Sequence, residues 1–221
     1  MSEFADELTS DYPAAESQVV FRSGRVIDVR TDRVRMPDGG EATRDVVVHP
    51  GAVGIIAIDD NGRVLLIHQY RHATGRRLWE PPAGLLDVVG EDPLVAARRE
   101  LYEEAHLEAD RWDVLVDAYT SPGMTDEAVR IYLAREVREA QQPRFAGEHE
   151  EADMPVKWVP LPEAVAAVLG GRLHNPLAVM GILAAAAAYD ETFVGLRRSD
   201  APWPEMSDFP GSGAATATAP G

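Results

Sequence analysis

Three glutamates, Glu100, Glu103 and Glu104, lie within five residues of one another and are the side chains best suited to chemistry. At spacings of three and four residues, their carboxylates would lie on one side of a helix, where they repel one another. Hard divalent cations bind oxygen ligands of this kind, and magnesium binds through a few carboxylates together with substrate phosphates. Manganese accepts similar ligands. The pattern therefore indicates a Mg²⁺ or Mn²⁺ site, although most glutamate clusters of this kind are simply the solvated face of a helix.

The elements next to the cluster are predicted to position it. The upstream segment Pro81-Pro82-Ala83-Gly84 indicates a turn that aims a backbone carbonyl at the carboxylates, with glycine relaxing the local dihedral limits. Asp92 is a good N-cap for the helix, and Pro93 suits its first turn. The face of the helix that packs on the core carries apolar residues at helical spacing, namely Leu94, Ala97, Leu101 and Ala105.

Strand signals dominate the sequence before the helix. Strands are expected at residues 19–22, 26–36 and 42–49, and a hairpin at residues 52–58 and 64–70 encloses Asp59-Asp60-Asn61-Gly62. Both arms of this hairpin are almost wholly apolar, which predicts burial on two faces. The remaining sequence predicts strands at 112–120, 128–137 and 156–159 and helices at 162–169 and 176–189. Together these elements predict an α+β domain, a mixed sheet with flanking helices.

Composition restricts the partners. The 221 residues include 21 basic and 37 acidic ones, giving a formal charge of −16, which argues against binding to nucleic acid. An acidic protein that acts on an anionic substrate needs bound cations. No apolar run reaches membrane-spanning length, there is no cysteine and the N-terminus lacks a signal-peptide pattern, so a cytoplasmic location is expected. Residues 1–16 and 197–221 are predicted to be disordered.

The segment from Gly84 to Leu107 resembles the Nudix box. That box reads glycine, five residues, glutamate, seven residues, then Arg-Glu-aliphatic-x-Glu-Glu-x-Gly-aliphatic. This chain departs from it twice, with six residues between Gly84 and Glu91 and with His106 at the second glycine. We expect His106 to end the helix in a left-handed conformation and to have no catalytic role. The positions that match are Gly84, Glu91, Arg99, Glu100, Leu101, Glu103, Glu104 and Leu107.

The resemblance implies an α/β/α layered Nudix fold over residues 51–192, preceded by an antiparallel β extension over residues 17–50. It implies that Glu100 and Glu104 are the principal ligands of two or three Mg²⁺ ions, with Glu103 as a further or water-mediated ligand. The carbonyl of Ala83 would complete the coordination. It also implies that Arg99 orients the glutamates by ion pairing and that Glu91 pairs within the box.

Features outside the box resemble the ADP-ribose pyrophosphatase branch of the family. Pro122 lies fifteen residues after Leu107, although a Pro-Gly turn would look the same. In this branch a glutamate of a mobile loop acts on the attacking water, which implies Glu151, with Glu150 as the alternate, unless this acidic loop is merely solvated. Arg71 and Glu80 are expected to contact phosphate or ribose, with a surface ion pair as the alternative. Trp79 is expected either near them or in the core.

The resemblance therefore implies Mg²⁺-dependent hydrolysis of ADP-ribose to AMP and ribose 5-phosphate. The alternatives are another nucleoside-diphosphate sugar or nucleotide as substrate, a non-catalytic nucleotide-sugar-binding regulator, or a purely structural domain. The branch also implies a homodimer in which the N-terminal strands are exchanged and Arg44 contacts the partner's site.

Overall fold

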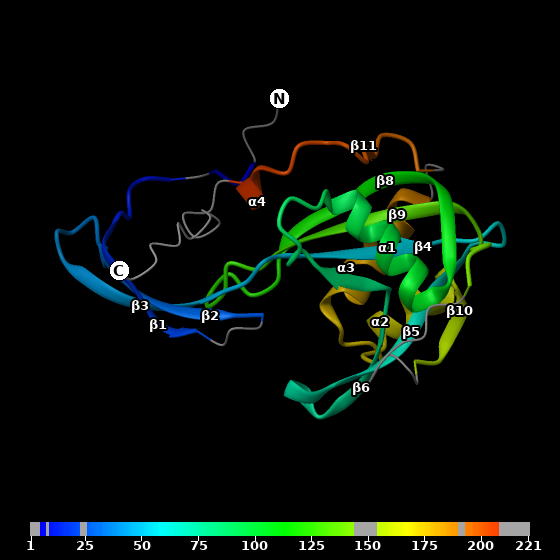
Figure 1. Cartoon of the computed structure of the whole chain (residues 1–221), viewed down its shortest axis with the longest axis horizontal. Helices are drawn as coiled ribbons and strands as arrows, with labels where there is room; N and C mark the ends of the chain where they lie inside the picture. The colour runs from blue at the N-terminus through cyan, green and yellow to red at the C-terminus, as the bar shows by residue number, and fades with distance from the viewer. Residues whose placement is uncertain (1–4, 8, 23–25, 144–153, 190–192, 208–221) are drawn as a thin grey trace. The chain divides into compact units, whose positions relative to one another are not determined.

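The computed structural model (Figure 1) describes residues 5–7, 9–22, 26–143, 154–189 and 193–207. The chain divides into two units, one formed by Met1–Pro50 with Ser121–Glu127 and the other by Gly51–Thr120 with Ala128–Gly221. The short segment Ser121–Glu127 joins the smaller unit through hydrogen bonds with Val47, whose N–H donates to the Met124 carbonyl at 2.9 Å.

The smaller unit is a three-stranded antiparallel sheet in the order β1-β2-β3. The sheet begins at Ala14, inside the segment predicted to be disordered, so that prediction is wrong for residues 14–16. Ala14 pairs with Val34, and the composition of the first residues alone gives no sign of this distant partner. The bounds are β1 Ala14–Arg22, β2 Asp28–Arg35 and β3 Glu41–Val48.

The larger unit contains two sheets. The first has five strands in the order β11-β8-β9-β4-β7, and it is mixed because β4 runs parallel to β9 while the other pairs are antiparallel. Its strands are β4 Ala52–Ala57, β7 Ala83–Leu85, β8 Leu107–Tyr119, β9 Ala128–Glu139 and β11 Arg197–Arg198. The second is antiparallel in the order β10-β5-β6, formed by β5 Arg63–Arg71, β6 Arg76–Glu80 and β10 Val156–Pro160, with the 3₁₀ helix η1 His72–Thr74 between β5 and β6.

Helices cover both faces of the five-stranded sheet, and β4 shows why. Its alternate residues Val53 and Ile55 pack in one core cluster with Leu101 of α1. Ile56, which points the other way, packs in a second cluster with Ile182 of α3. This confirms the α/β/α layering and the buried, apolar character predicted for the strand. The helices are α1 Pro93–Ala105, α2 Leu161–Leu169, α3 Pro176–Tyr189 and α4 Pro204–Ser207, and none within the described ranges is long and apolar enough to cross a membrane.

The hairpin predicted around Asp59-Asp60-Asn61-Gly62 is largely wrong. The turn forms, with the Gly62 N–H donating to the Asp59 carbonyl at 2.9 Å, but only one bridge, between Ile58 and Val64, joins the two arms. Beyond this bridge, β4 pairs with β7 and β9 in one sheet, and β5 pairs with β6 and β10 in the other. The same turn can join two strands that are apolar on both faces whether they pair as one hairpin or lie in different sheets.

The segment from Arg197 to Ser207, which was predicted to be disordered, is structured. Arg130 of β9, only 2% exposed, donates to the carbonyls of Ala201 and Pro202 at 2.8 and 3.0 Å. The same guanidinium pairs with both carboxylate oxygens of Asp117 and lies 4.8 Å from the ring centroid of Trp203. We call this arrangement the C-terminal clamp. The prediction failed because the order comes from a buried charge on a distant strand.

Candidate active site

Helix α1 forms where the local sequence signals predict it. The side chain of Asp92 accepts from the N–H of Leu94 at 2.8 Å and of Val95 at 3.4 Å, and Pro93 occupies the first turn. His106 ends the helix with a left-handed φ of 56°, and its N–H donates to the carbonyls of Leu101 and Tyr102. The substitution of the usual glycine by histidine therefore keeps the backbone conformation that the helix end requires.

Glu100 lies directly against Gly84. A Cβ built at Gly84 would lie 2.1 Å from Glu100 Oε1, far inside contact distance. The φ of Gly84 is not in the left-handed region, so the predicted relaxation of dihedral limits is not the reason for this glycine. Its role is steric, since only the absence of a side chain lets the carboxylate approach the turn. Sequence spacing gives no signal of this close approach between helix and turn.

Glu104 reaches the same turn one helical turn later. Its Oε2 accepts from the N–H of Ala83 at 2.9 Å. Ala83 is held in place because β7 pairs with β4, with Ala83 opposite Gly54 and Gly84 opposite Val53. The predicted turn is thus a short edge strand, and two carboxylates four residues apart converge on it.

Arg99 links the acidic side chains of the box. Its guanidinium contacts Glu91 through Nε at 3.2 Å and Nη2 at 3.1 Å, Glu100 at 2.6 Å and Glu103 at 3.2 Å. Hydrogen bonds to Glu91, followed by the charges nearby, raise the pKa of Arg99 above its usual range despite its partial burial. The predicted pairing of Arg99 with the glutamates, and of Glu91 within the box, is confirmed.

The carboxylates suit a hard cation in type and placement. As they stand, no three His, Asp or Glu side chains of the described residues are gathered tightly enough to hold a metal ion. Glu100 and Glu103 contact Arg99 instead, and Glu104 accepts from Ala83. All three are nonetheless oxygen donors on one side of α1, and two of them meet a backbone turn, which is the kind of donor set magnesium uses. The residues present therefore fit the predicted cation, whereas their role as its ligands stays a prediction.

Arg71 and Glu80 contact each other in the second sheet. Glu80 is fully buried, and its carboxylate accepts from Arg71 Nε at 2.9 Å and Nη2 at 2.6 Å, while 43% of the arginine side chain stays exposed. A buried carboxylate needs such a charge-assisted partner. The pair therefore joins a buried carboxylate to an arginine whose side chain is partly exposed. Contact with substrate stays a prediction for both residues.

The other predicted residues fall in different places. Arg44 lies exposed on β3 in the smaller unit, where its Nη1 donates to the Thr43 carbonyl at 2.9 Å. Glu151 and its alternate Glu150 lie outside the described residues, so their predicted roles remain predictions. Trp79 packs against the core and stacks on His68 with ring centroids 4.5 Å apart.

An α/β/α domain with a capped helix that presents glutamates to a backbone turn defines a specific class of protein. A family model described as NUDIX domain matches residues 48–179, and the chain therefore belongs to the Nudix family. The resemblance found in the box extends over the larger part of the chain.

Relatives of known description agree with this membership. The chain is 52% identical over 168 residues to an ADP-ribose pyrophosphatase of Mycobacterium tuberculosis (strain ATCC 25618 / H37Rv), covering 76% of this chain and 80% of that protein. It is 34% identical to a methanol dehydrogenase activator of Bacillus methanolicus, covering 72% of this chain and 85% of that one. A crystal structure described as an ADP compounds hydrolase matches with a TM-score of 0.68 at 20% identity, covering 86% of this chain and 100% of that one, which shows the shared fold.

Proposed function

We propose that this chain is a Nudix hydrolase that cleaves the diphosphate of ADP-ribose to AMP and ribose 5-phosphate in the presence of Mg²⁺. The convergence of Glu100 and Glu104 on the turn at Ala83 and Gly84 carries the proposal. If this face of the helix only contacted solvent, there would be no need for a glycine opposite Glu100 or for a backbone N–H that donates to Glu104. This observation therefore separates the site from an ordinary solvated helix.

The residues of the site divide the work. Glu100, Glu103, Glu104 and the Ala83 carbonyl would hold Mg²⁺, which when bound offsets the charge of the diphosphate and acidifies water. Arg99 fixes the direction of Glu100 and Glu103 through its ion pairs. Glu151, or its alternate Glu150, is assigned as the base that takes a proton from the attacking water. Oxygen of that water bonds to one phosphorus, and the bridging P–O bond breaks to release the two monophosphates.

The relatives support ADP-ribose as the substrate. A protein 52% identical over most of its length is described as an ADP-ribose pyrophosphatase, and so is a Bacillus subtilis (strain 168) protein 39% identical over 69% of its length. Other relatives at about the 30% level are described as GDP-mannose pyrophosphatases, for which the sugar and base differ but the diphosphate is shared. The product assay therefore compares ADP-ribose with other substrates that contain a diphosphate.

The test is product analysis with purified protein. ADP-ribose, ADP-glucose, a diadenosine polyphosphate and GTP are incubated with Mg²⁺, with Mn²⁺ and with EDTA. AMP and ribose 5-phosphate should form fastest from ADP-ribose, and only with a divalent cation. Glu104→Gln should reduce turnover by at least about a hundredfold, while Glu163→Gln, on the exposed first turn of α2, serves as the matched control. Wild-type turnover by Glu104→Gln at saturating Mg²⁺ would contradict the assignment, and no turnover of any substrate would favour a regulator.

We also propose that the chain forms a homodimer through the smaller unit. Every residue of β1 is exposed, including Val19, Val20 and Phe21 at 43%, 55% and 55%. A run of exposed apolar residues on a strand is typical of an interface between chains. Light scattering should give twice the 24.1 kDa of one chain, and a monomer would refute both the dimer and the predicted cross-subunit contact of Arg44.

A further inference from the structure

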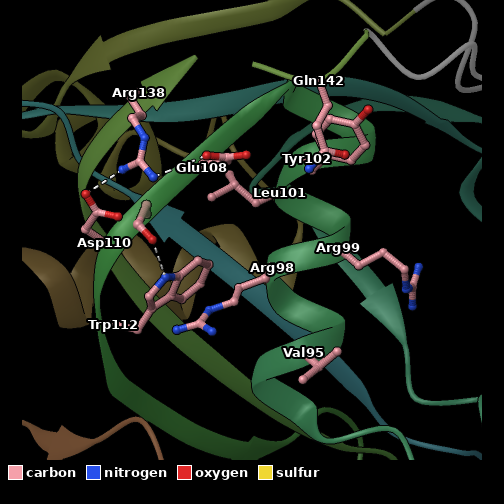
Figure 2. Close-up of a pocket in the computed structure, with 11 residues that line it drawn as sticks. Val95, Arg98, Arg99, Leu101, Tyr102, Glu108, Asp110, Trp112, Arg138 and Gln142 are labelled. Atoms are coloured by element: carbon pink, nitrogen blue, oxygen red, sulfur yellow. Dashed lines mark hydrogen bonds and ion pairs between the residues drawn. The ribbon is translucent and has the colours of Figure 1, made fainter. Parts of the chain in front are cut away.

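A pocket of about 530 Å³ opens beside α1 (Figure 2). Its walls come from α1, the first part of β8 and the end of β9, and its volume lies within the range of small-molecule sites. The predicted metal ligands Ala83, Glu100, Glu103 and Glu104, all within the described residues, do not line it. The lining residues include Val95, Arg98, Tyr102, Glu108, Trp112 and Arg138.

Arg98 and Arg99 are consecutive residues of helix α1, and their side chains point in different directions (Figure 2). Arg99 is also among the lining residues, but in Figure 2 its side chain points away from Arg98 and Trp112, in keeping with its ion pairs to Glu91, Glu100 and Glu103. Arg98, by contrast, lies beside Trp112 on the pocket side, with its guanidinium carbon 5.8 Å from the ring centroid. The pocket and the candidate active site therefore share Arg99 of α1, but Glu100, Glu103 and Glu104 are not among the residues that line the pocket.

Arg138 and Arg98, which both line the pocket, differ in whether a carboxylate pairs with them. Arg138 is held by two carboxylates, Asp110 at 2.5 Å and Glu108 at 3.2 Å. Hydrogen bonding to Arg138 lowers the pKa of Asp110, so this group stays ionised. Arg98 is exposed and has no ion pair with any carboxylate among the described residues. In a chain of net charge −16, a guanidinium left to an aromatic ring beside a pocket is available to an anion.

The walls also suit a planar ring. Trp112 is 7% exposed, and its indole N–H donates to the Ala109 carbonyl at 2.9 Å, which fixes the ring in place. Tyr102 is similarly fixed, since its hydroxyl donates to the Pro143 carbonyl at 2.5 Å. Leu101 is fully buried at the base of the pocket, so the floor is apolar. Aromatic walls, an apolar floor and one available guanidinium match a ligand with a ring and a single anionic group.

We propose that this pocket is a second binding site, for a nucleoside monophosphate. The phosphate pairs with Arg98, the base lies against Tyr102 and the apolar floor, and the Glu108 carboxylate accepts from an amino or hydroxyl group of the ligand. A diphosphate fits less well, because Glu108 and Asp110 already pair with Arg138, which leaves Arg98 as the only guanidinium among the described pocket residues that is not paired with a carboxylate. The proposal concerns binding alone and does not depend on the proposed hydrolysis.

The chain offers a direct test because it contains no cysteine. Val95 lies at the pocket and is 52% exposed, so Val95→Cys gives a single thiol whose reaction with a chromogenic disulfide reports occupancy. AMP should slow this reaction. It should leave unchanged the reaction of Leu169→Cys, a control thiol at a position 74% exposed on α2. The assay needs no turnover, so it stays informative if ADP-ribose is not hydrolysed.

Adding Arg98→Gln should raise the AMP concentration for half-protection about tenfold, which corresponds to about 1.4 kcal/mol. Arg172→Gln, an exposed arginine that follows α2, should not change it. Calorimetry of AMP with the cysteine-free Arg98→Gln and Arg172→Gln chains checks that the thiol itself is not responsible. Absence of protection by millimolar AMP, or protection that survives Arg98→Gln, would overturn the proposal. Equal protection by inorganic phosphate would overturn the assignment to a nucleotide.

Discussion

Replacing Gly84 by alanine tests the site at its tightest contact. The added Cβ would lie 2.1, 2.2 and 2.3 Å from Oε1, Cδ and Cγ of Glu100. Ordinary contact begins at about 3.4 Å, so the carboxylate must retreat by roughly 1.3 Å, the difference between 3.4 and 2.1 Å. Because the obstructing atoms all belong to a flexible side chain and none to the backbone, we expect the glutamate to rotate away without moving the helix.

The two consequences of this movement should differ in size. Misplacement of a catalytic group by about 1 Å costs on the order of a hundredfold in rate. Stability should fall by only about 1 kcal/mol, because the change breaks the Arg99–Glu100 pair but leaves the backbone pairing of β7 intact. Steady-state hydrolysis of ADP-ribose with Mg²⁺ measures the first effect, and urea unfolding measures the second.

Gly54→Ala is the matched control, since Gly54 pairs with Ala83 in the adjacent strand. A Cβ there meets Leu177 at 3.4 Å, an ordinary contact, so activity should stay close to that of the wild type. If Gly84→Ala hydrolyses ADP-ribose within threefold of the wild-type rate, the position of Glu100 in this structure is not the one that supports turnover. A loss of activity matched by a loss of folding would also refute the reasoning.

Three further predictions concern stability. Asp92→Ala should cost about 1 kcal/mol of unfolding free energy, since it removes the N-cap of α1, and loss of helical circular dichroism at a lower urea concentration would show it. Arg130→Met should lower the free energy of unfolding by about 3 kcal/mol, because it leaves the buried carboxylate of Asp117 with fewer partners. Arg197→Met, at a side chain 48% exposed, should lower it by less than about 1 kcal/mol in the same urea titration. Burial alone would raise the pKa of Asp59, but hydrogen bonds from the side chain and backbone of Arg63 outweigh it and lower the pKa below 3.8. Asp59 therefore stabilises the fold above pH 3.8 and loses this contribution as the pH falls through the pKa of Asp59 in the folded state. The destabilisation by Asp59→Asn, about 1 kcal/mol at pH 7, should therefore shrink toward pH 3. A destabilisation that does not change with pH would contradict the assignment.

The site helix could be predicted because its signals are local. Asp92, Pro93 and the apolar stripe fix its start and its buried face, and the helix ends at His106 as expected. The pairing of Arg99 with the neighbouring glutamates, which the resemblance to the Nudix box implied, is local as well. Each of these features involves residues within about two turns of one another, where the sequence order itself sets the distance.

Features that depend on distant partners were not predictable. The sequence gives the same apolar pattern for β4 and β5 whether they pair with each other or with strands far along the chain. The contact of Gly84 with Glu100 depends on how α1 packs on β7, which no residue spacing reports. The pocket beside α1 could not be predicted for the same reason, because its walls join residues of α1, β8 and β9.

The C-terminal clamp has a consequence for synthesis of the protein. Arg130 precedes the carbonyls of Ala201 and Pro202 by 71 and 72 residues. At translation rates of about 5 to 20 residues per second, those acceptors appear roughly 4 to 14 seconds after the arginine. During this interval the guanidinium lacks two of its acceptors, and the nascent sheet keeps a hydrated charge at a place that is dry in the complete fold. We expect ribosome-bound chains that stop before Ala201 to remain sensitive to protease. The sheet should therefore reach its full stability only after Pro202 has been translated.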